Sequence, residues 1–177
     1  MKVCDGSSFH WEVRAKNPSG NIPQVNEQFY SDTRSYEYYA YNARMFVSLA
    51  AYRRTILDAE SATKGWPLLR PPVMYNPEDR RARQISYQSF YLGPSLYVAP
   101  VLDSQIFELK VYLPGERDTW SYIHVWTGQR YLGGQEVTVP TPYGKPAVFL
   151  VEGKQVPELD SFLQFVKREN ETTLTVD

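Results

Sequence analysis

The chain of 177 residues has few of the residues that build disulfide frameworks and metal sites. It contains one cysteine, Cys4, and two histidines, His10 and His124. One cysteine excludes an internal disulfide framework and a cysteine-rich zinc site. Neither histidine begins a His-x-x-x-His spacing, so a histidine-based site would need carboxylates as further ligands. We therefore expect no metal and no cofactor.

Long apolar runs and a strong charge of one sign are missing as well. No run approaches the roughly 20 apolar residues that span a bilayer, and the mean hydropathy is -0.47. The start, MKVCDGSSFHW, lacks the apolar stretch of a signal peptide, so none is expected. A net charge of -1 gives no reason to expect nucleic acid. We predict neither a membrane partner nor a nucleic-acid partner.

The residues that are abundant indicate a globular protein rich in aromatic side chains. Hydrophobic residues make up 42% and charged residues 22% of the chain, a balance that supports a folded core. Aromatic residues reach 15%. The length suits one domain with its own core, and it is too short for a complete (β/α)₈ barrel of about 250 residues.

The strongest helical pattern runs from about residue 33 to residue 63. Ser31 and Asp32 can cap its N-terminus, while Gly65 and Pro67 end it. Apolar side chains recur close to a 3.6-residue period at Tyr36, Tyr39, Ala43, Phe46, Ala50, Ile56 and Leu57. A helix of that length, about 46 Å at 1.5 Å per residue, needs a large partner surface for its apolar stripe.

From about Leu96 the pattern changes to short strands separated by turns. The expected strands are 96–101, 107–113, 120–126, 136–139 and 147–151. Glycine-containing turn signals separate them, which is typical of an antiparallel β-sandwich. A last amphipathic helix is expected at 158–168, followed by a loose tail after Asn170.

Few side chains suggest chemistry of their own. The sequence contains no dinucleotide fingerprint, no P-loop and no Gly-x-Ser-x-Gly nucleophile elbow. Cys4 is interpreted as an inert thiol, His124 as a structural strand residue, and the basic cluster 80–83 as a solvated face. Four aromatic residues could be sugar platforms or sandwich core, and we favour the core: Trp120, Tyr122, Trp126 and Tyr131.

A series of short motifs carries a family resemblance. Residues 87–101, YQSFYLGPSLYVAPV, resemble the Y-Q-F-x-L-G-x-x-L-x-V-A-P-V segment of glycoside hydrolase family 31. Upstream, residues 65–71, GWPLLRP, are similar to that family's G-x-P-x-x-R-P. Further matches follow in the family's order at 111–114, 120, 126–128, 131–134, 139–140 and 146–149. Together they cover about residues 65–151.

The first thirty residues are most similar to the sulfoquinovosidase-like branch of the family. In that branch the end of the barrel reads roughly F-x-P-x-x-R-x-H-E-G-N-x-P-x-x-N-x-Q. The matching residues are Phe9, Arg14, Gly20, Asn21, Pro23, Asn26 and Gln28.

The resemblance implies an α+β fragment with a defined order of parts. We expect the last strand and long helix of a (β/α)₈ barrel, followed by an antiparallel β-sandwich. The implied divisions are a barrel remnant at 1–95, a proximal C-terminal β-sandwich at 96–157, and a helix and tail at 158–177.

The resemblance also implies that the catalytic residues are not in this stretch. Retaining glycosidases need two carboxyl groups about 5–5.5 Å apart. The family's W-x-D motif for the nucleophile and H-S-D-I-G-G motif for the acid do not occur here. Residues 30–33, YSDT, superficially resemble the acid motif, but helix capping is the better interpretation. We predict no catalytic residue in the chain.

Two cations remain as candidate substrate contacts. The family has a sugar-binding histidine after the last barrel strand, and counting from Arg14 places Lys16 there, before a two-residue expansion. Arg14 and Lys16 are therefore the predicted substrate-binding residues, and a cation would suit an anionic sugar. A solvated loop cation is the alternative for Lys16.

Two functions stay open from the sequence. The first is a C-terminal segment of a retaining α-glycosidase, inactive alone, whose partners are an α-linked glycoside and the missing barrel portion or another chain. The alternative is a stand-alone β-sandwich that binds carbohydrate or protein. The long amphipathic helix favours the first, because a separate binding module has no need of it.

Overall fold

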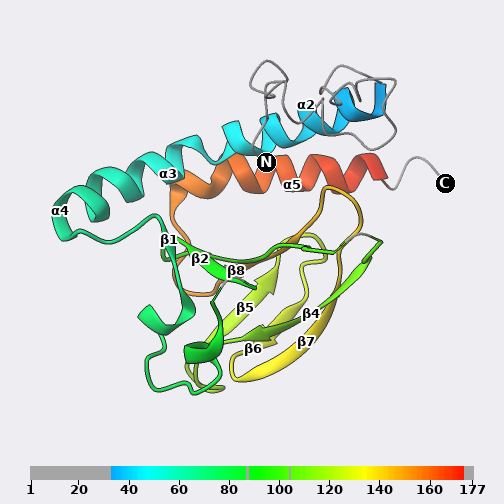
Figure 1. Cartoon of the computed structure of the whole chain (residues 1–177). Coiled ribbons are helices and arrows are strands. Elements are labelled where there is room, and N and C mark those ends of the chain that lie inside the picture. The colour runs from blue at the N-terminus through cyan, green and yellow to red at the C-terminus, as the bar shows by residue number, and fades with distance from the viewer. Residues whose placement is uncertain (1–32, 87, 104, 174–177) are drawn as a thin grey trace, which may run out of the picture. The chain divides into compact units, whose positions relative to one another are not determined.

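The computed structural model describes residues 33–86, 88–103 and 105–173. The chain divides into two compact units, Met1–Arg44 and Met45–Asp177. The second unit contains the β-sheets and most of the helices (Figure 1). The predicted positions of Cys4, His10 and the caps Ser31 and Asp32 lie outside the described residues.

The predicted helix at 33–63 is helical over that range, but it is not one regular α-helix. The segments are α2 (Thr33–Ser48), α3 (Ala50–Ile56), a π-helical turn (Leu57–Ser61) and α4 (Ala62–Lys64). At the first break, Ser48 Oγ donates to the Met45 carbonyl at 2.7 Å, a local bond that competes with helix geometry. Gly65 ends the run at φ +70°, as its predicted role requires.

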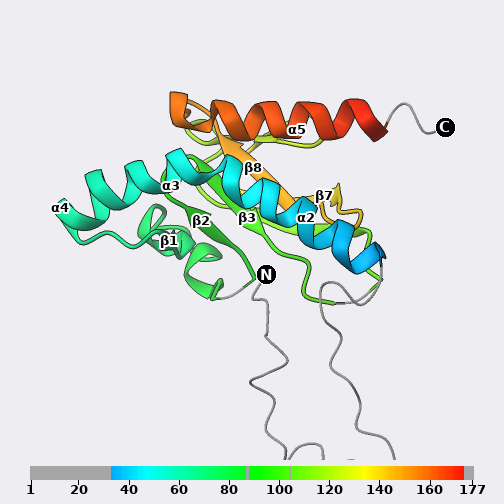
Figure 2. The ribbon, with the colours of Figure 1, turned by 90° about the horizontal axis from the view of Figure 1, so that it is seen from above.

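The larger sheet has six strands in the order β1-β2-β3-β8-β5-β6, and every pairing is antiparallel. Its strands are β1 (Leu69–Arg70), β2 (Phe90–Leu92), β3 (Leu96–Ala99), β5 (Ser121–His124), β6 (Arg130–Leu132) and β8 (Ala147–Val151). Figure 2 shows β2, β3 and β8 running side by side. The sequence did not predict β1, β2 or β6, since two or three residues carry no periodicity.

The smaller sheet pairs β4 (Glu108–Leu113) with β7 (Gln135–Pro140). One apolar cluster takes side chains from both sheets, including Val111 of β4, Val139 of β7 and Phe149 of β8. The expected antiparallel β-domain is therefore confirmed. The six-stranded sheet contains strands from both sides of residue 95, and the predicted divisions at 95 and 157 stay predictions.

Helix α3 is attached to the larger sheet through one tyrosine. Tyr52 is 1% exposed, and its hydroxyl donates to the Leu92 carbonyl at 2.8 Å and accepts from the Ser95 amide at 2.9 Å. Gly93, between those two partners, has φ +58°, and a Cβ there would lie 2.3 Å from Ile56 Cδ1. The close approach of the helix to the β2–β3 turn therefore requires glycine.

The C-terminal helix is longer than predicted. A 3₁₀ turn (Pro157–Leu159) leads into α5 (Asp160–Thr173), so the expected loose tail after Asn170 is wrong as far as Thr173. Asn170 Nδ2 donates to the Trp126 carbonyl at 2.8 Å, and Lys145 Nζ donates to Asn170 Oδ1 at 3.3 Å. These bonds tie the last turns to the β-domain, which a local sequence pattern does not show.

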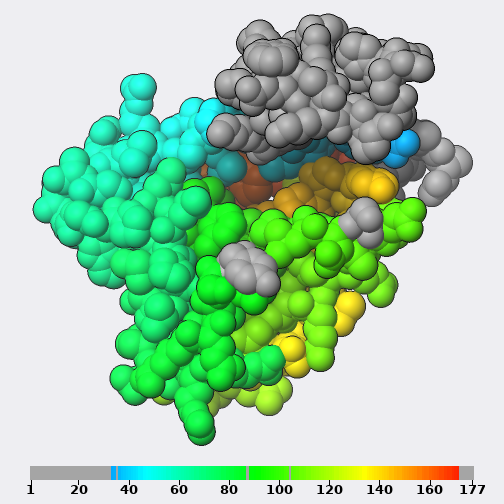
Figure 3. Space-filling view, in the orientation of Figure 1, coloured from blue at the N-terminus to red at the C-terminus, as the bar shows by residue number. Residues whose placement is uncertain are grey.

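The segment between α4 and β2 is mostly loop, as expected for 70–79, with 3₁₀ turns at Pro72–Met74 and Ala82–Gln84. Figure 3 shows this segment, teal to green, as part of the molecular surface. Asp79 attaches it to the smaller sheet, because its carboxylate accepts from the Tyr112 hydroxyl at 2.9 Å and the Gly115 amide at 3.1 Å.

Candidate functional site

The predicted substrate contacts Arg14 and Lys16 lie outside the described residues. The candidate site within the described part of the chain is therefore a hollow in the β-domain of about 460 Å³. Its size falls within the usual range of small-ligand pockets. The hollow lies wholly in the second unit, between β4 and the segments that flank β2 and β3.

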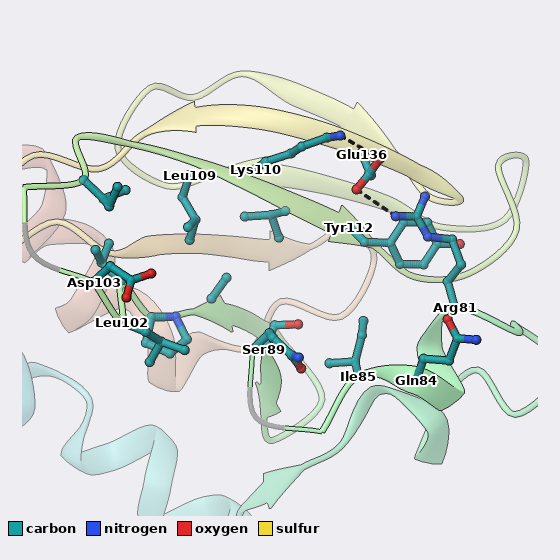
Figure 4. A pocket seen from close by; sticks show the side chains of 16 residues that line it. Arg81, Gln84, Ile85, Ser89, Leu102, Asp103, Leu109, Lys110, Tyr112 and Glu136 are labelled. Atoms are coloured by element: carbon teal, nitrogen blue, oxygen red, sulfur yellow. Dashed lines mark ion pairs between the residues drawn. The ribbon is translucent and has the colours of Figure 1, made fainter.

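Two walls form this hollow, which we call the β4 groove (Figure 4). Leu109 of β4 and Ile85 of the facing segment point into it from opposite sides. Ala99 and Val111 also line it and belong to the core cluster, so the groove opens on the seam between the two sheets. Its lining is therefore mainly apolar.

A charged cluster stands at one end of the β4 groove. Glu136 accepts from Arg81 at 2.7 Å and from Lys110 at 3.0 Å. The Arg81 guanidinium lies 4.2 Å from the centroid of the Tyr112 ring. Hydrogen bonds from both cations hold the pKa of Glu136 below its usual value. The basic cluster at 80–83 is thus partly engaged in pairing rather than fully solvated.

Asp79, behind the same wall, has a structural role. Besides Tyr112 and Gly115, its carboxylate accepts from the amides of Arg81 and Ala82 at 2.9 Å and 3.2 Å. Burial alone would raise the pKa of Asp79, but these hydrogen bonds outweigh it and lower the pKa. A carboxylate saturated in this way is a poor general acid at neutral pH.

The family-like G-x-P-x-x-R-P segment supplies a buried arginine. Arg70 is 1% exposed and hydrogen-bonds Glu60, the Tyr75 hydroxyl and, at 2.8 Å, the Pro67 carbonyl. Burial would lower the pKa of Arg70, but Glu60 and Tyr75 more than offset this and raise it. The ion pair joins the π-helical turn to the first strand, so it is a structural junction.

The aromatic residues considered as sugar platforms serve packing. Tyr122 and Trp126 are buried, and the Trp126 indole donates to the Pro146 carbonyl at 2.7 Å. Trp120 is partly buried, with Lys154 Nζ 4.0 Å from its ring centroid. A Cβ on Gly115 would lie 2.4 Å from Trp120 Cγ, so that glycine packs against the same indole. The interpretation as core is confirmed for Tyr122 and Trp126.

His124 is structural, as predicted. It is 0% exposed, its Nδ1 lies 2.9 Å from Thr127 Oγ1, and its ring packs 5.2 Å from that of Phe149. Its Nε2 has no hydrogen-bond partner among the described residues. Burial lowers the pKa of His124 to about 4, so the ring is neutral at pH 7.

The described part of the chain offers neither a metal site nor a membrane-spanning helix. Within the described ranges, no group of three or more His, Cys, Asp or Glu residues could hold a metal ion. None of the described helices is long and apolar enough to cross a membrane. Among the described carboxylates, Glu60, Asp79 and Glu136 each bond basic groups or backbone amides, as structural partners do.

Comparison with known proteins identifies the family. Residues 65–156, just over half of the chain, match the model of the glycosyl hydrolase family 31 C-terminal domain. The sulfoquinovosidase of Escherichia coli (strain K12) is 35% identical over 149 residues, which cover 84% of this chain and 21% of that protein. A sulfoquinovosidase of Agrobacterium fabrum is 35% identical over 131 residues, covering 73% of this chain and 19% of that protein.

The similarity to solved structures agrees with the sequence matches. A family 31 sulfoquinovosidase from E. rectale superposes with a TM-score of 0.70 at 30% identity, covering 87% of this chain and 21% of that one. The chain spans about a fifth of the length of these relatives. The mostly antiparallel sheet, the ordered motifs from Gly65 onward and these matches lead to one conclusion: the chain belongs to glycoside hydrolase family 31 and contains that family's C-terminal domain.

Proposed function

We propose that this chain is the C-terminal part of a retaining α-glycosidase and supports a catalytic barrel whose active residues lie in other sequence. On this proposal, residues before Gly65 are the last strand and long helix of the barrel, and the β-domain follows them. The order of elements supports it, because a helical run ends at Gly65 and the family domain begins there.

One observation carries the proposal. The match to the sulfoquinovosidases extends over 84% of this chain but only 21% of the E. coli protein, and neither catalytic motif occurs in the matched stretch. Hydrolysis with retention needs two carboxyl groups at a fixed short separation. We therefore infer that the isolated chain does not cleave glycosides.

The names of the relatives support a proposal for the substrate class of the whole enzyme. Two similar proteins and one similar structure are named sulfoquinovosidases. We infer that the substrate is an α-linked glycoside of an anionic, sulfonated sugar. Arg14 and Lys16 are the residues of this chain that would contact it, since a cation at the end of the barrel would favour a negatively charged sugar.

The test of inactivity uses the chain of residues 1–177 with p-nitrophenyl α-glycosides and a sulfoquinovoside. We expect turnover no higher than that of a buffer blank, while the E. coli sulfoquinovosidase serves as the positive control. Turnover above the blank that disappears in Lys16→Ala would overturn the proposal.

The genomic sequence immediately upstream gives an independent test. An in-frame stretch with W-x-D followed by H-S-D-I-G-G would support the proposal that the catalytic residues belong to the same polypeptide. A stop codon and an unrelated upstream gene would instead require a second chain to supply them.

A stand-alone binding module is the alternative. The exposed helix residues count against it, because Phe46 and Val47 are 64% and 69% exposed and an isolated module gains nothing from them. Titration with an α-linked oligosaccharide distinguishes the two, and saturable binding by residues 1–177 would favour the module.

A further inference from the structure

The two-stranded sheet has an edge that no described strand covers. In the β4–β7 pair, the Thr141 amide donates to the Phe107 carbonyl at 2.6 Å, and Glu108 lies opposite Pro140, which has no amide hydrogen. Antiparallel pairs alternate between hydrogen-bonded and non-hydrogen-bonded residues. The backbone groups of Leu109 and Val111 therefore face β7, and those of Glu108 and Lys110 face the opposite edge.

That outer edge of β4 is the edge beside the β4 groove. The groove is lined by consecutive β4 residues from Leu109 to Tyr112, which have side chains on both faces of the sheet (Figure 4). The Tyr112 carbonyl already accepts from the Tyr97 hydroxyl at 3.0 Å. The amides and carbonyls of Glu108 and Lys110 remain, and such unpaired edge groups are a template for another strand.

The two edges of this small sheet are not equivalent. Pro140 removes one donor from the outer edge of β7, and proline on an edge discourages strand addition. β4 contains no proline. Leu102, Ile106 and Phe107, which precede it, are 58%, 39% and 52% exposed, so apolar surface adjoins the open edge. Of the two outer edges of this sheet, that of β4 is therefore the one that favours addition of another strand.

The β4 sequence is complementary to itself. In an antiparallel pair centred on Leu109, Glu108 of each copy would stand opposite Lys110 of the other, and both residues have outward-facing backbone groups. That register gives four backbone hydrogen bonds and two opposite-charge pairs. Glu108 takes part in none of the ion pairs found among the described residues. Lys110 would lie between Glu136 and the Glu108 of the partner subunit.

We propose that β4 is a dimerisation edge at which a second copy of this chain pairs its own β4 antiparallel about Leu109. The two small sheets then form one four-stranded sheet, in the order β7-β4-β4-β7. The symmetry is two-fold, so each copy contributes the same surface. This inference concerns the chain itself and does not depend on the proposed glycosidase function.

Charge reversal tests the register directly. Sedimentation equilibrium of residues 1–177, from micromolar to millimolar concentration, measures the dimer dissociation constant. Glu108→Lys and Lys110→Glu each replace two attractive pairs with two repulsive ones, so each is expected to weaken the dimer about tenfold or more. The double variant Glu108→Lys/Lys110→Glu restores both pairs and is expected to recover dimerisation.

Mixing the two single variants tests the proposed register most directly. Glu108→Lys and Lys110→Glu chains combined in equal amounts are expected to form a heterodimer, because every cross-strand pair is then opposite in charge. Asp118→Lys makes the same change of charge at an exposed residue outside β4 and is the matched control, with unchanged dimerisation. Absence of a dimer, a dimer that ignores both reversals, or no heterodimer on mixing would overturn the proposal.

Amide exchange gives a second readout that does not depend on substitutions. The Lys110 amide is expected to become protected as the concentration rises, whereas the Val111 amide, bonded to β7, is protected at every concentration. Protection of the Lys110 amide that does not change with concentration would contradict pairing between copies.

Discussion

Phe149 and Phe46 are the same residue type in two parts of the second unit, and their exposed fractions are 0% and 64%. Phe149 lies on β8 between β3 and β5, with aromatic rings of Tyr97 and Tyr122 each 6.4 Å away. Phe46 instead has the Arg53 guanidinium 3.4 Å from its ring centroid. The β-domain buries its large side chains within itself, whereas the helical segment leaves several of them on the surface.

This difference shows which part of the chain has a complete core. The β-domain has two sheets to enclose its apolar cluster. The helical segment is attached through the Tyr52 hydrogen bonds, the buried Ile56 and the Arg70–Glu60 pair. Val47 and Leu57 stay exposed. An exposed apolar helix face is typical of an element that packs on a further body. The proposed barrel would provide that body.

The largest expected effect comes from the core of the β-domain. Phe149→Ala is expected to lower the free energy of unfolding by about 4 kcal/mol, because it removes a fully buried ring and leaves a cavity. Phe46→Ala is the matched change in the helical segment, and its cost is expected to stay under about 1 kcal/mol because the ring is 64% exposed. Urea unfolding measures both, and equal costs would contradict the comparison.

The second-largest effect is expected at the Arg70–Glu60 pair, which joins the helical segment to the β-domain. Arg70→Met is expected to cost about 3 kcal/mol, since it leaves Glu60 and the Tyr75 hydroxyl without their buried partner. Arg83→Met breaks the exposed Arg83–Glu78 pair and is expected to cost under about 0.5 kcal/mol. Thermal melts of the two variants compare these losses of stability. An equal loss in Arg83→Met and Arg70→Met would contradict the prediction.

His124 makes the β-domain sensitive to acid. Its pKa is about 4 in the folded chain against 6.5 for an ordinary histidine, so the unfolded chain binds a proton first. Stability from this group is complete above pH 6.5 and falls as the pH drops toward 4, by up to about 3 kcal/mol. His124→Gln is expected to reduce the pH dependence of the free energy of unfolding between pH 6.5 and pH 4. His10→Gln, made in parallel, measures the share of the other histidine, and an unchanged slope in His124→Gln would refute the assignment.

The smallest expected effect is on the helix surface. Val47→Ser is expected to change the free energy of unfolding by less than about 0.5 kcal/mol, because the side chain is 69% exposed. The same change in a β-domain residue, Val139→Ser, is expected to cost at least about 2 kcal/mol, since Val139 is 0% exposed. Denaturant midpoints compare the two, and a large cost at Val47 would mean that the helix face is already covered.

Much of the fold was predictable from local pattern. The helical run before Gly65 and the longer strands between Leu96 and Val151 follow from periodicity and turn residues, because these features depend on neighbours in sequence. The short strands β1, β2 and β6 were not predictable, since each is a strand only through pairing with a neighbouring strand. The break near Leu49 and the π-helical turn were also missed. Side-chain bonds lie at both places, from Ser48 to the Met45 carbonyl and from Arg70 to Glu60, and a local pattern does not show them.

The candidate site was likewise predictable only in part. Absent motifs and the order of family-like segments, read from the sequence, already predicted that no catalytic carboxylate pair lies in this stretch. The β4 groove brings together residues that are far apart in the chain, from Arg81 to Glu136, so no local sequence pattern predicts it. Its one hint was the basic cluster at 80–83, which we interpreted as solvated and which the structure partly pairs with Glu136.

The amino-acid sequence was sufficient to establish the family, the succession of helix and antiparallel strands, and the absence of the catalytic motifs, because each depends on residue identity and order. The three-dimensional fold was needed to show that Arg70 is buried against Glu60, that His124 is neutral in the core, and that one edge of β4 lies open beside an apolar groove. Burial and pairing between distant segments set these properties, and neither is encoded in any short stretch of the chain.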